Sequence, residues 1–139
     1  MPKKRGEKEK LSKEWLICSI VIILVVSLNI VTQKYTEESV DYIDNILKDF
    51  KETLSEDEII KEDAELKIND IMSEWQDKYN LLAYFIEHDE LEKVETEITL
   101  LKANIEVEQY KEAIPILDKC AFILNHIKDK FTLEIKNIF

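Results

Sequence analysis

The chain has 139 residues, with 19 Lys and Arg against 30 Asp and Glu, so its formal net charge is −11. It contains one Gly and two Pro. This composition argues against β-sandwiches and β-barrels, because their many tight turns need such residues. The acidic balance argues against a nucleic-acid partner, because phosphates attract basic surfaces. These counts predict an all-α protein with long helices.

The charge is distributed in three segments. Residues 1–14 carry six basic and three acidic side chains, net +3, residues 15–33 carry none, and residues 34–139 carry 13 basic and 27 acidic ones, net −14. We therefore expect three parts in chain order. These are a basic cytoplasmic leader (1–14), a transmembrane signal-anchor helix (15–33) and an acidic extracytoplasmic helical bundle (34–139).

The uncharged segment is predicted to cross a membrane. Fourteen of the eighteen residues from Trp15 to Thr32 are apolar, and eighteen helical residues span roughly 27 Å, close to the thickness of a bilayer's hydrocarbon core. Many of these residues are β-branched, but in lipid a helix still forms because the backbone must satisfy its own hydrogen bonds. Four side chains are expected to anchor the segment: Trp15, Ile20, Leu24 and Leu28.

The orientation follows from the positive-inside rule. Six basic residues precede the segment and only Lys34 follows it closely, so the N-terminus is predicted in the cytoplasm and the C-terminal domain outside it. The alternatives are a cleaved secretory signal, a lipoprotein signal that uses Cys18, and a buried helix of a soluble protein. A cleaved signal has an apolar core of only about 7–15 residues followed by small residues, and Cys18 lies near the start of the core.

Four stretches of the acidic part have the apolar spacing of amphipathic helices. They are expected over about 37–54, over about 57–87, from about 89 to an end between residues 103 and 107, and over about 108–129. The first continues directly from the membrane segment. The expected core positions are Val40, Ile43, Leu47, Phe50, Leu54, Ile60, Ala64, Ile68, Ile71, Trp75, Tyr79, Leu82, Phe85, Leu91, Val94, Ile98, Leu101, Ile105, Tyr110, Ala113, Leu117, Cys120, Leu124 and Ile127.

The helix starts are predicted from capping residues and from proline. Thr36 is the expected N-cap of the first helix. Capping boxes are expected for the next two, from Ser55 with Glu58 and from Asp89 with Glu92. Pro115 removes a backbone donor inside the fourth stretch, so a late start or a kink is expected there.

Short connections between these helices favour an antiparallel, up-down bundle of about four helices after the transmembrane helix. A coiled-coil homo-oligomer is the competing arrangement, because several apolar stripes keep a heptad spacing.

Few residues in the sequence point to chemistry. Cys18 is expected at membrane depth and Cys120 in the core, so no disulfide is predicted. Neither His88 nor His126 follows a Glu by three residues, as in bundles that bind two irons; carboxylates beside His88 leave a loose metal site as an alternative. With Gly6 as the one glycine, no glycine-rich phosphate loop can form. We therefore predict no enzyme activity, no catalytic residue, no cofactor and no metal.

Two segments resemble a known family: YFIEHDELEKVETEITLLKANI at 84–105 and FILNHIKDKFTLEIKNIF at 122–139. Together with Trp75 they are similar to an uncharacterised, domain-of-unknown-function family of small single-pass membrane proteins from low-GC, often spore-forming, Gram-positive bacteria. Pro115 and Ile135 depart from the family pattern. The resemblance implies a basic leader, one span and a helical region, no established activity, and a multi-span membrane protein as a partner.

The predicted function is that of a non-enzymatic, membrane-anchored helical module that binds another cell-envelope or membrane protein. The candidate contact residues are His88, Asp89, Glu90, Asn137 and Phe139. The alternative is a ligand- or ion-sensing bundle that acts through a membrane partner, because helical bundles bind ligands between their helices. The leader of fourteen residues is too short to be an output domain.

Overall fold

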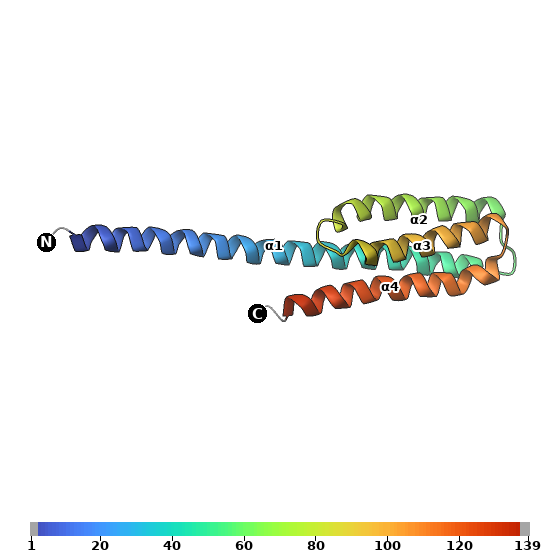
Figure 1. Ribbon diagram of the computed structural model, residues 1–139. Coiled ribbons are helices and arrows are strands. Elements are labelled where there is room, and N and C mark those ends of the chain that lie inside the picture. The colour runs from blue at the N-terminus through green and yellow to red at the C-terminus, as the bar shows by residue number, and fades with distance from the viewer. Residues whose placement is uncertain (1–2, 137–139) are drawn as a thin grey trace. The chain divides into compact units, whose positions relative to one another are not determined.

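The computed structural model of the protein describes the backbone of residues 3–136 and the side chains of residues 13–132. This part contains four α-helices and no strand: α1 (Lys3–Leu54), α2 (Lys61–Leu82), α3 (His88–Glu106) and α4 (Tyr110–Lys136) (Figure 1). The predicted all-α class is confirmed, with a long first helix that contains the apolar segment, followed by a bundle.

The chain divides into two compact units, residues 1–34 and residues 35–139. In the first unit, α1 contains the uncharged segment, which by length and composition is the one candidate membrane span among the described residues. The four expected anchor side chains, Trp15, Ile20, Leu24 and Leu28, are all exposed. A continuous row of exposed apolar side chains is typical of a surface that contacts lipid or another protein.

The first bundle helix is a continuation of the apolar segment, as predicted, because α1 is unbroken from Lys3 to Leu54. Thr36 therefore lies inside a helix, where it is buried. Its prediction as an N-cap was wrong, since a helix that does not start there has no free N–H groups to cap.

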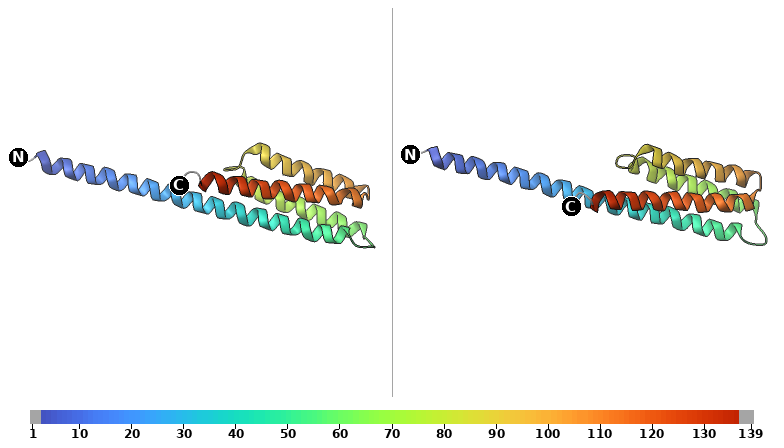
Figure 2. Two further views of the ribbon diagram at one scale, coloured as in Figure 1. Left: turned by 90° about the horizontal axis from the view of Figure 1, so that it is seen from below. Right: turned by 60° about the horizontal axis from the view of Figure 1, so that its bottom comes forward.

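In the second unit, residues 35–54 of α1 pack with α2, α3 and α4 as an up-down bundle (Figure 2). Neighbouring helices are antiparallel, because residue numbers fall along one helix as they rise along the other. Lys51 lies 2.5 Å from Asp118, and Asp41 lies 2.6 Å from Lys128. The other neighbouring pairs show the same antiparallel order. Their contacts are Thr53–Lys67, Tyr42–Lys78, Gln76–Glu95, Tyr79–His88, Glu97–Lys119 and Glu87–Lys130.

Among the described side chains, twenty apolar ones are buried in the core, five from each helix, and the sequence predicted all of them. They are Val40, Ile43, Leu47, Phe50, Leu54, Ala64, Ile68, Ile71, Trp75, Leu82, Leu91, Val94, Ile98, Leu101, Ile105, Ala113, Leu117, Cys120, Leu124 and Ile127. Of the remaining predicted positions, Tyr79, Phe85 and Tyr110 are half-buried and Ile60 is exposed. Removal of this apolar surface from water is the main force that holds the four helices together.

The start of α2 differs from the prediction. The helix begins at Lys61, after a loop over residues 55–60, and its N-cap Ile60 makes no side-chain capping bond. Ser55 does not cap α2, because its hydroxyl donates to the carbonyl of Lys51 at 2.7 Å and so extends the end of α1. The predicted capping box of Ser55 with Glu58 was therefore wrong.

The connection between α3 and α4 closes with a Schellman motif. Glu108 has a φ of 59°, in the left-handed region, and its N–H donates to the carbonyl of Ile105 at 3.0 Å. The N–H of Gln109 donates to the carbonyl of Asn104 at 2.9 Å. These are the two hydrogen bonds of the motif, which satisfy carbonyls at the end of α3.

The start of α4 agrees with the late start expected from its proline. The helix begins at Tyr110, two residues after the expected Glu108, and continues through Pro115 to Lys136. Pro115 occupies the sixth position, so it removes the backbone hydrogen bond to the carbonyl of Lys111. The exposed position of Pro115 leaves that carbonyl access to water.

Candidate functional site

The turn between α2 and α3 is closed by backbone hydrogen bonds to the last residue of α2. The carbonyl of Leu82 accepts from the N–H of Ile86 at 2.9 Å and from that of Phe85 at 3.1 Å. These bonds fold the turn back over the bundle end, so that Phe85 and Ile86 are half-buried. The sequence therefore places two apolar side chains beside the start of α3.

The N-cap of α3 lies two residues before the predicted one. The helix begins at His88 with Glu87 as N-cap, and no side chain makes a capping bond there. Asp89 was the predicted cap, and this was wrong because Asp89 already lies in the first helical turn. In that turn the carboxylates of Asp89 and Glu90 still stabilise the positive end of the helix dipole.

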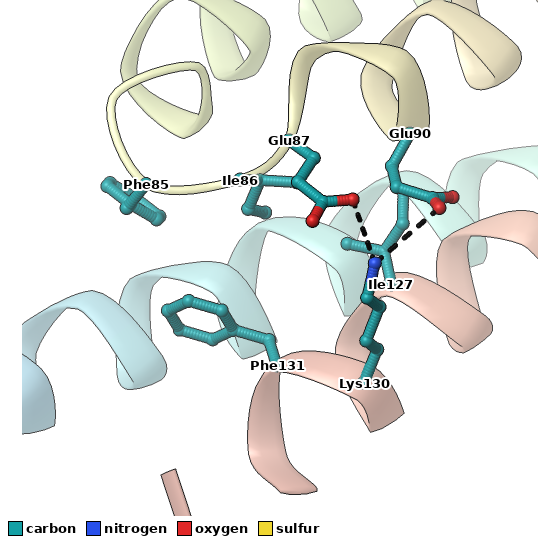
Figure 3. A pocket seen from close by; sticks show the side chains of 7 residues that line it. All are labelled: Phe85, Ile86, Glu87, Glu90, Ile127, Lys130 and Phe131. Atoms are coloured by element: carbon teal, nitrogen blue, oxygen red, sulfur yellow. Dashed lines mark hydrogen bonds and ion pairs between the residues drawn. The ribbon is translucent and has the colours of Figure 1, made fainter. Parts of the chain in front are cut away.

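A small cavity lies between this turn and α4 (Figure 3). Its volume is about 50 Å³, enough for a few water molecules or one small side chain. It is lined by Phe85, Ile86, Glu87, Glu90, Ile127, Lys130 and Phe131. Four of these residues are apolar and three are charged, so the cavity offers both an apolar surface and an ion-paired one.

Of the three charged residues of the cavity, Lys130 contacts both of the others. Lys130 Nζ lies 2.9 Å from Glu87 Oε2 and 3.8 Å from Glu90 Oε1 (Figure 3). Lys93 Nζ lies 3.1 Å from the same Glu90 oxygen. The hydrogen bond from Lys93 lowers the pKa of Glu90, whereas burial raises it. The positive charges of Lys93 and Lys130 also lower this pKa, so the net shift is downward. Glu90 is therefore ionised at neutral pH.

Aromatic contacts place the cavity at one end of the bundle. The ring of Phe85 lies 6.0 Å from that of Phe131 and 6.3 Å from that of Tyr35, centroid to centroid. Tyr35 is the first residue of the second unit. The cavity thus lies at the end of the bundle where α1 enters it.

The predicted contact residues are only partly brought together. Glu90 lines the cavity, whereas His88 and Asp89 are exposed beside it. Asn137 and Phe139 lie outside the described residues. Sequence reasoning predicted Ile127 in the core but assigned neither it nor Lys130 and Phe131 to this site, because they come from α4, about forty residues after the turn along the chain.

His88 makes contacts within its own hairpin. Its Nδ1 lies 2.9 Å from the hydroxyl of Tyr79 on α2, and its Nε2 lies 3.0 Å from Glu92 Oε1 on α3. In the part of the chain that the structure describes, no three His, Cys, Asp or Glu side chains are grouped closely enough to hold a metal ion. His88 therefore links α2 to α3.

Two buried carboxylates beside Cys120 were also missed by sequence reasoning. Asp44 lies 2.5 Å from Lys48 on the same helix, and Glu97 lies 2.6 Å from Lys119 on α4. The second oxygen of Glu97, Oε2, is buried without a hydrogen-bond partner among the described residues. The spacing of Asp44 and Lys48 could be read from the sequence, but the contact between α3 and α4 could not.

The thiol of Cys120 is expected to be unreactive in the folded protein. Burial is the largest of the effects that raise its pKa to about 12, and the negative charges of Glu97 and Asp44 contribute to the same rise. Because the thiolate is the reactive form, a Cys18→Ala variant should react with a maleimide at pH 8 only after unfolding in guanidinium. Rapid labelling of the native variant, measured by mass spectrometry, would contradict this prediction.

Comparison with known proteins gives one match. A model of a domain of unknown function, DUF4363, matches residues 30–138. The matched part contains the whole bundle and every residue that lines the cavity. Searches of curated proteins and of solved structures find no match to the chain.

Proposed function

The chain belongs to the DUF4363 family, a domain of unknown function, and we propose that it is a membrane-anchored module that binds another membrane or cell-envelope protein. The binding site is the cavity at the α2–α3 turn. The module is not an enzyme, and its bundle lies outside the cytoplasm.

Membrane anchoring is supported by the first unit. The apolar segment is helical, long enough to cross a bilayer, and exposed along its length. The basic residues of the leader, net +3 over residues 1–14, favour a cytoplasmic N-terminus. Residues 35–139 then lie on the opposite side of the membrane.

The observation that carries the proposed binding function is the mixed lining of the cavity. Ile127 and Phe131 supply apolar surface, and the ion pair of Glu87 with Lys130 supplies polar groups that are still partly exposed. Binding energy at protein interfaces concentrates where one partner side chain fills a small pocket surrounded by polar groups. One small apolar side chain of a partner fits a space of about 50 Å³.

Charge indicates the kind of partner surface. Residues 34–139 have a net charge of −14, so a basic partner surface is attracted over distances comparable to the Debye length and an acidic one is repelled. Lys130 neutralises part of the charge at the cavity itself. We therefore propose a partner that offers a small apolar side chain flanked by basic residues.

Site-specific photo-crosslinking in native membranes tests this proposal. A photoreactive amino acid at Glu87 should capture a second protein, identified by mass spectrometry, while the same replacement at Glu108 should not. The two positions are closely matched: each is an exposed glutamate next to a helix start, and each pairs with a lysine at 2.9 Å. They lie at opposite ends of the bundle.

Two results would contradict the proposed binding function. One is capture of the same proteins from Glu87 and Glu108, which would indicate collision rather than binding. The other is recovery of the chain alone from both positions. The second result would favour the sensor alternative, which a groove of about 390 Å³ between α1 and α2 supports.

A further inference from the structure

We propose that the groove between α1 and α2 is a second binding site, which takes a small organic cation: an amine with an apolar body. The groove has a volume of about 390 Å³, within the range of small-molecule sites. Its lining residues all lie in the second unit, between Tyr42 and Glu74. The site is separate from the cavity at the α2–α3 turn and requires no protein partner.

The floor of the groove is apolar. Phe50 of α1 and Ile71 of α2 are buried core residues that also line it. Ile46 beside them is half-buried, and Tyr42 adds an aromatic ring that is 43% exposed. Such a surface gains free energy when the apolar part of a ligand covers it.

The rim of the groove is acidic. Three carboxylates line it, Asp49 on α1 and Asp70 and Glu74 on α2, against one lysine, Lys67. Asp49 and Asp70 are exposed and form no ion pair among the described residues. Burial raises the pKa of Tyr42 and the charge of Glu74 raises it in the same direction, so this carboxylate lies beside the phenol. An acidic rim around an apolar floor attracts cations and repels anions.

Two lysines of α2 reach across to α1 at the two ends of the groove. Lys67 Nζ donates to Thr53 Oγ1 at 2.6 Å, and Lys78 Nζ lies 5.2 Å from the centre of the Tyr42 ring. The two contacts are eleven residues apart on each helix, which corresponds to about 16 Å. The three acidic lining residues lie between them, so negative charge is concentrated in the middle of the groove.

The carboxylates do not converge as a metal ion would require. Among the side chains that the structure describes, no three His, Cys, Asp or Glu groups are close enough to hold a metal, whereas divalent ions take several oxygen ligands at about 2.0–2.6 Å. An organic cation needs no such convergence. Its ammonium group pairs with one carboxylate of the rim while its apolar body covers the floor.

The size of the groove favours a small molecule over a protein segment. Packed helix axes are about 8–10 Å apart, so a groove about 16 Å long offers an opening of roughly 150 Å². A stable protein interface buries about 800 Å² on each partner. A partner helix laid along the groove would also meet the side chains of Lys67 and Lys78 at its ends.

Methyl NMR of the full-length chain in phosphatidylcholine nanodiscs tests the site, with phenethylammonium as the probe. In protein labelled at the isoleucine methyl groups, added probe should shift the resonances of Ile46 and Ile71 along a saturable curve. The resonance of Ile127, which lines the cavity at the α2–α3 turn, should stay in place. Phenethyl alcohol has the same apolar body without the charge and should bind several-fold more weakly.

A pair of double variants tests the role of the rim. Asp49→Asn together with Asp70→Asn should weaken binding of phenethylammonium about five- to ten-fold, because each substitution removes one surface charge that pairs with the probe. The matched control is Asp63→Asn with Asp129→Asn, which removes the same charge from exposed aspartates outside the groove and should leave the affinity unchanged. The resonance of Ile98, in the core, monitors the folding of both variants.

The outcomes separate this proposal from the proposed partner binding. Absence of a saturable shift at Ile46 and Ile71 into the millimolar range of probe overturns the site. Equal affinity for the amine and the alcohol overturns the assignment to a cation. Equal losses in the two double variants would mean that only the overall charge of the bundle attracts the probe, which also overturns it. Capture of a partner from Glu87 is scored separately, so either proposal can fail without the other.

Discussion

Replacement of Trp75 with Ala is expected to lower the free energy of unfolding of the bundle by about 3–5 kcal/mol, as is typical when a large buried aromatic side chain is removed. The indole is 1% exposed and heads the fully buried side chains by volume. It packs edge-on against Tyr79, with the ring centroids 5.9 Å apart. Its Nε1 has no hydrogen-bond partner among the described residues, so the loss comes from packing and burial rather than from a polar contact.

This loss is a large part of the total stability, because domains of this size are stable by only about 5–15 kcal/mol. Guanidinium unfolding of the full chain in micelles, followed by far-UV circular dichroism, measures it. Trp75→Phe should lose less, since a phenyl ring refills most of the space. Phe122→Ala is the control, because Phe122 is 72% exposed and should change the stability by less than about 0.5 kcal/mol. Equal losses from Trp75→Ala and Phe122→Ala would contradict the assignment of Trp75 to the core.

The core residues could be predicted from the sequence for a simple physical reason. In a four-helix bundle each helix buries one stripe, so the spacing of Val40, Ile43 and Leu47, and that of their counterparts on the other helices, already specifies which side chains face inward. Short connections then force neighbouring helices to be antiparallel. None of these inferences needs information about which residues meet across the core.

Helix ends were predicted less well, because capping depends on competition between local hydrogen bonds. Ser55 is close enough to serve either the end of α1 or the start of α2, and it donates to the carbonyl of Lys51 instead of capping α2. Asp89 has the right spacing to Glu92, but α3 gains two residues before the predicted start, His88 and Asp89 itself. The spacing of a capping box alone does not decide between such alternatives.

The candidate site shows the same division between local and tertiary information. The turn around Glu87 and Glu90 was predicted from a break in apolar spacing. The other side of the cavity, Lys130 and Phe131, was not, because the register between α3 and α4 fixes it. The pairing of buried Glu97 with Lys119 has the same origin. Sequence patterns therefore located half of the site, and the packing of α4 supplied the rest.

Replacement of Ile23 and Leu24 together with Arg is expected to move most of the chain out of the membrane fraction. The two residues lie at the midpoint of residues 15–32 and are exposed. Near the centre of a span each Arg costs about 2.5–3.5 kcal/mol, whereas each Leu, Ile, Val or Phe contributes only about −0.3 to −0.6 kcal/mol. Two arginines therefore cancel most of the favourable free energy of membrane insertion that the fourteen apolar residues contribute. Extraction of membranes with alkaline carbonate, followed by immunoblotting, measures the change.

The double Ala variant at the same two positions is the matched control, because it shortens both side chains without adding charge and should stay in the membrane. If the Arg variant also resists carbonate, the segment is not an anchor.

The mass of the chain without substitutions distinguishes an anchor from a cleaved signal. An uncleaved chain keeps residues 1–34, whereas cleavage removes them and releases the bundle. Protease added outside intact protoplasts should digest the bundle of the uncleaved chain, since the proposed orientation keeps only the basic leader inside. Protection of the bundle from that protease would reverse the proposed orientation, and with it the side of the membrane on which a partner must present its basic surface.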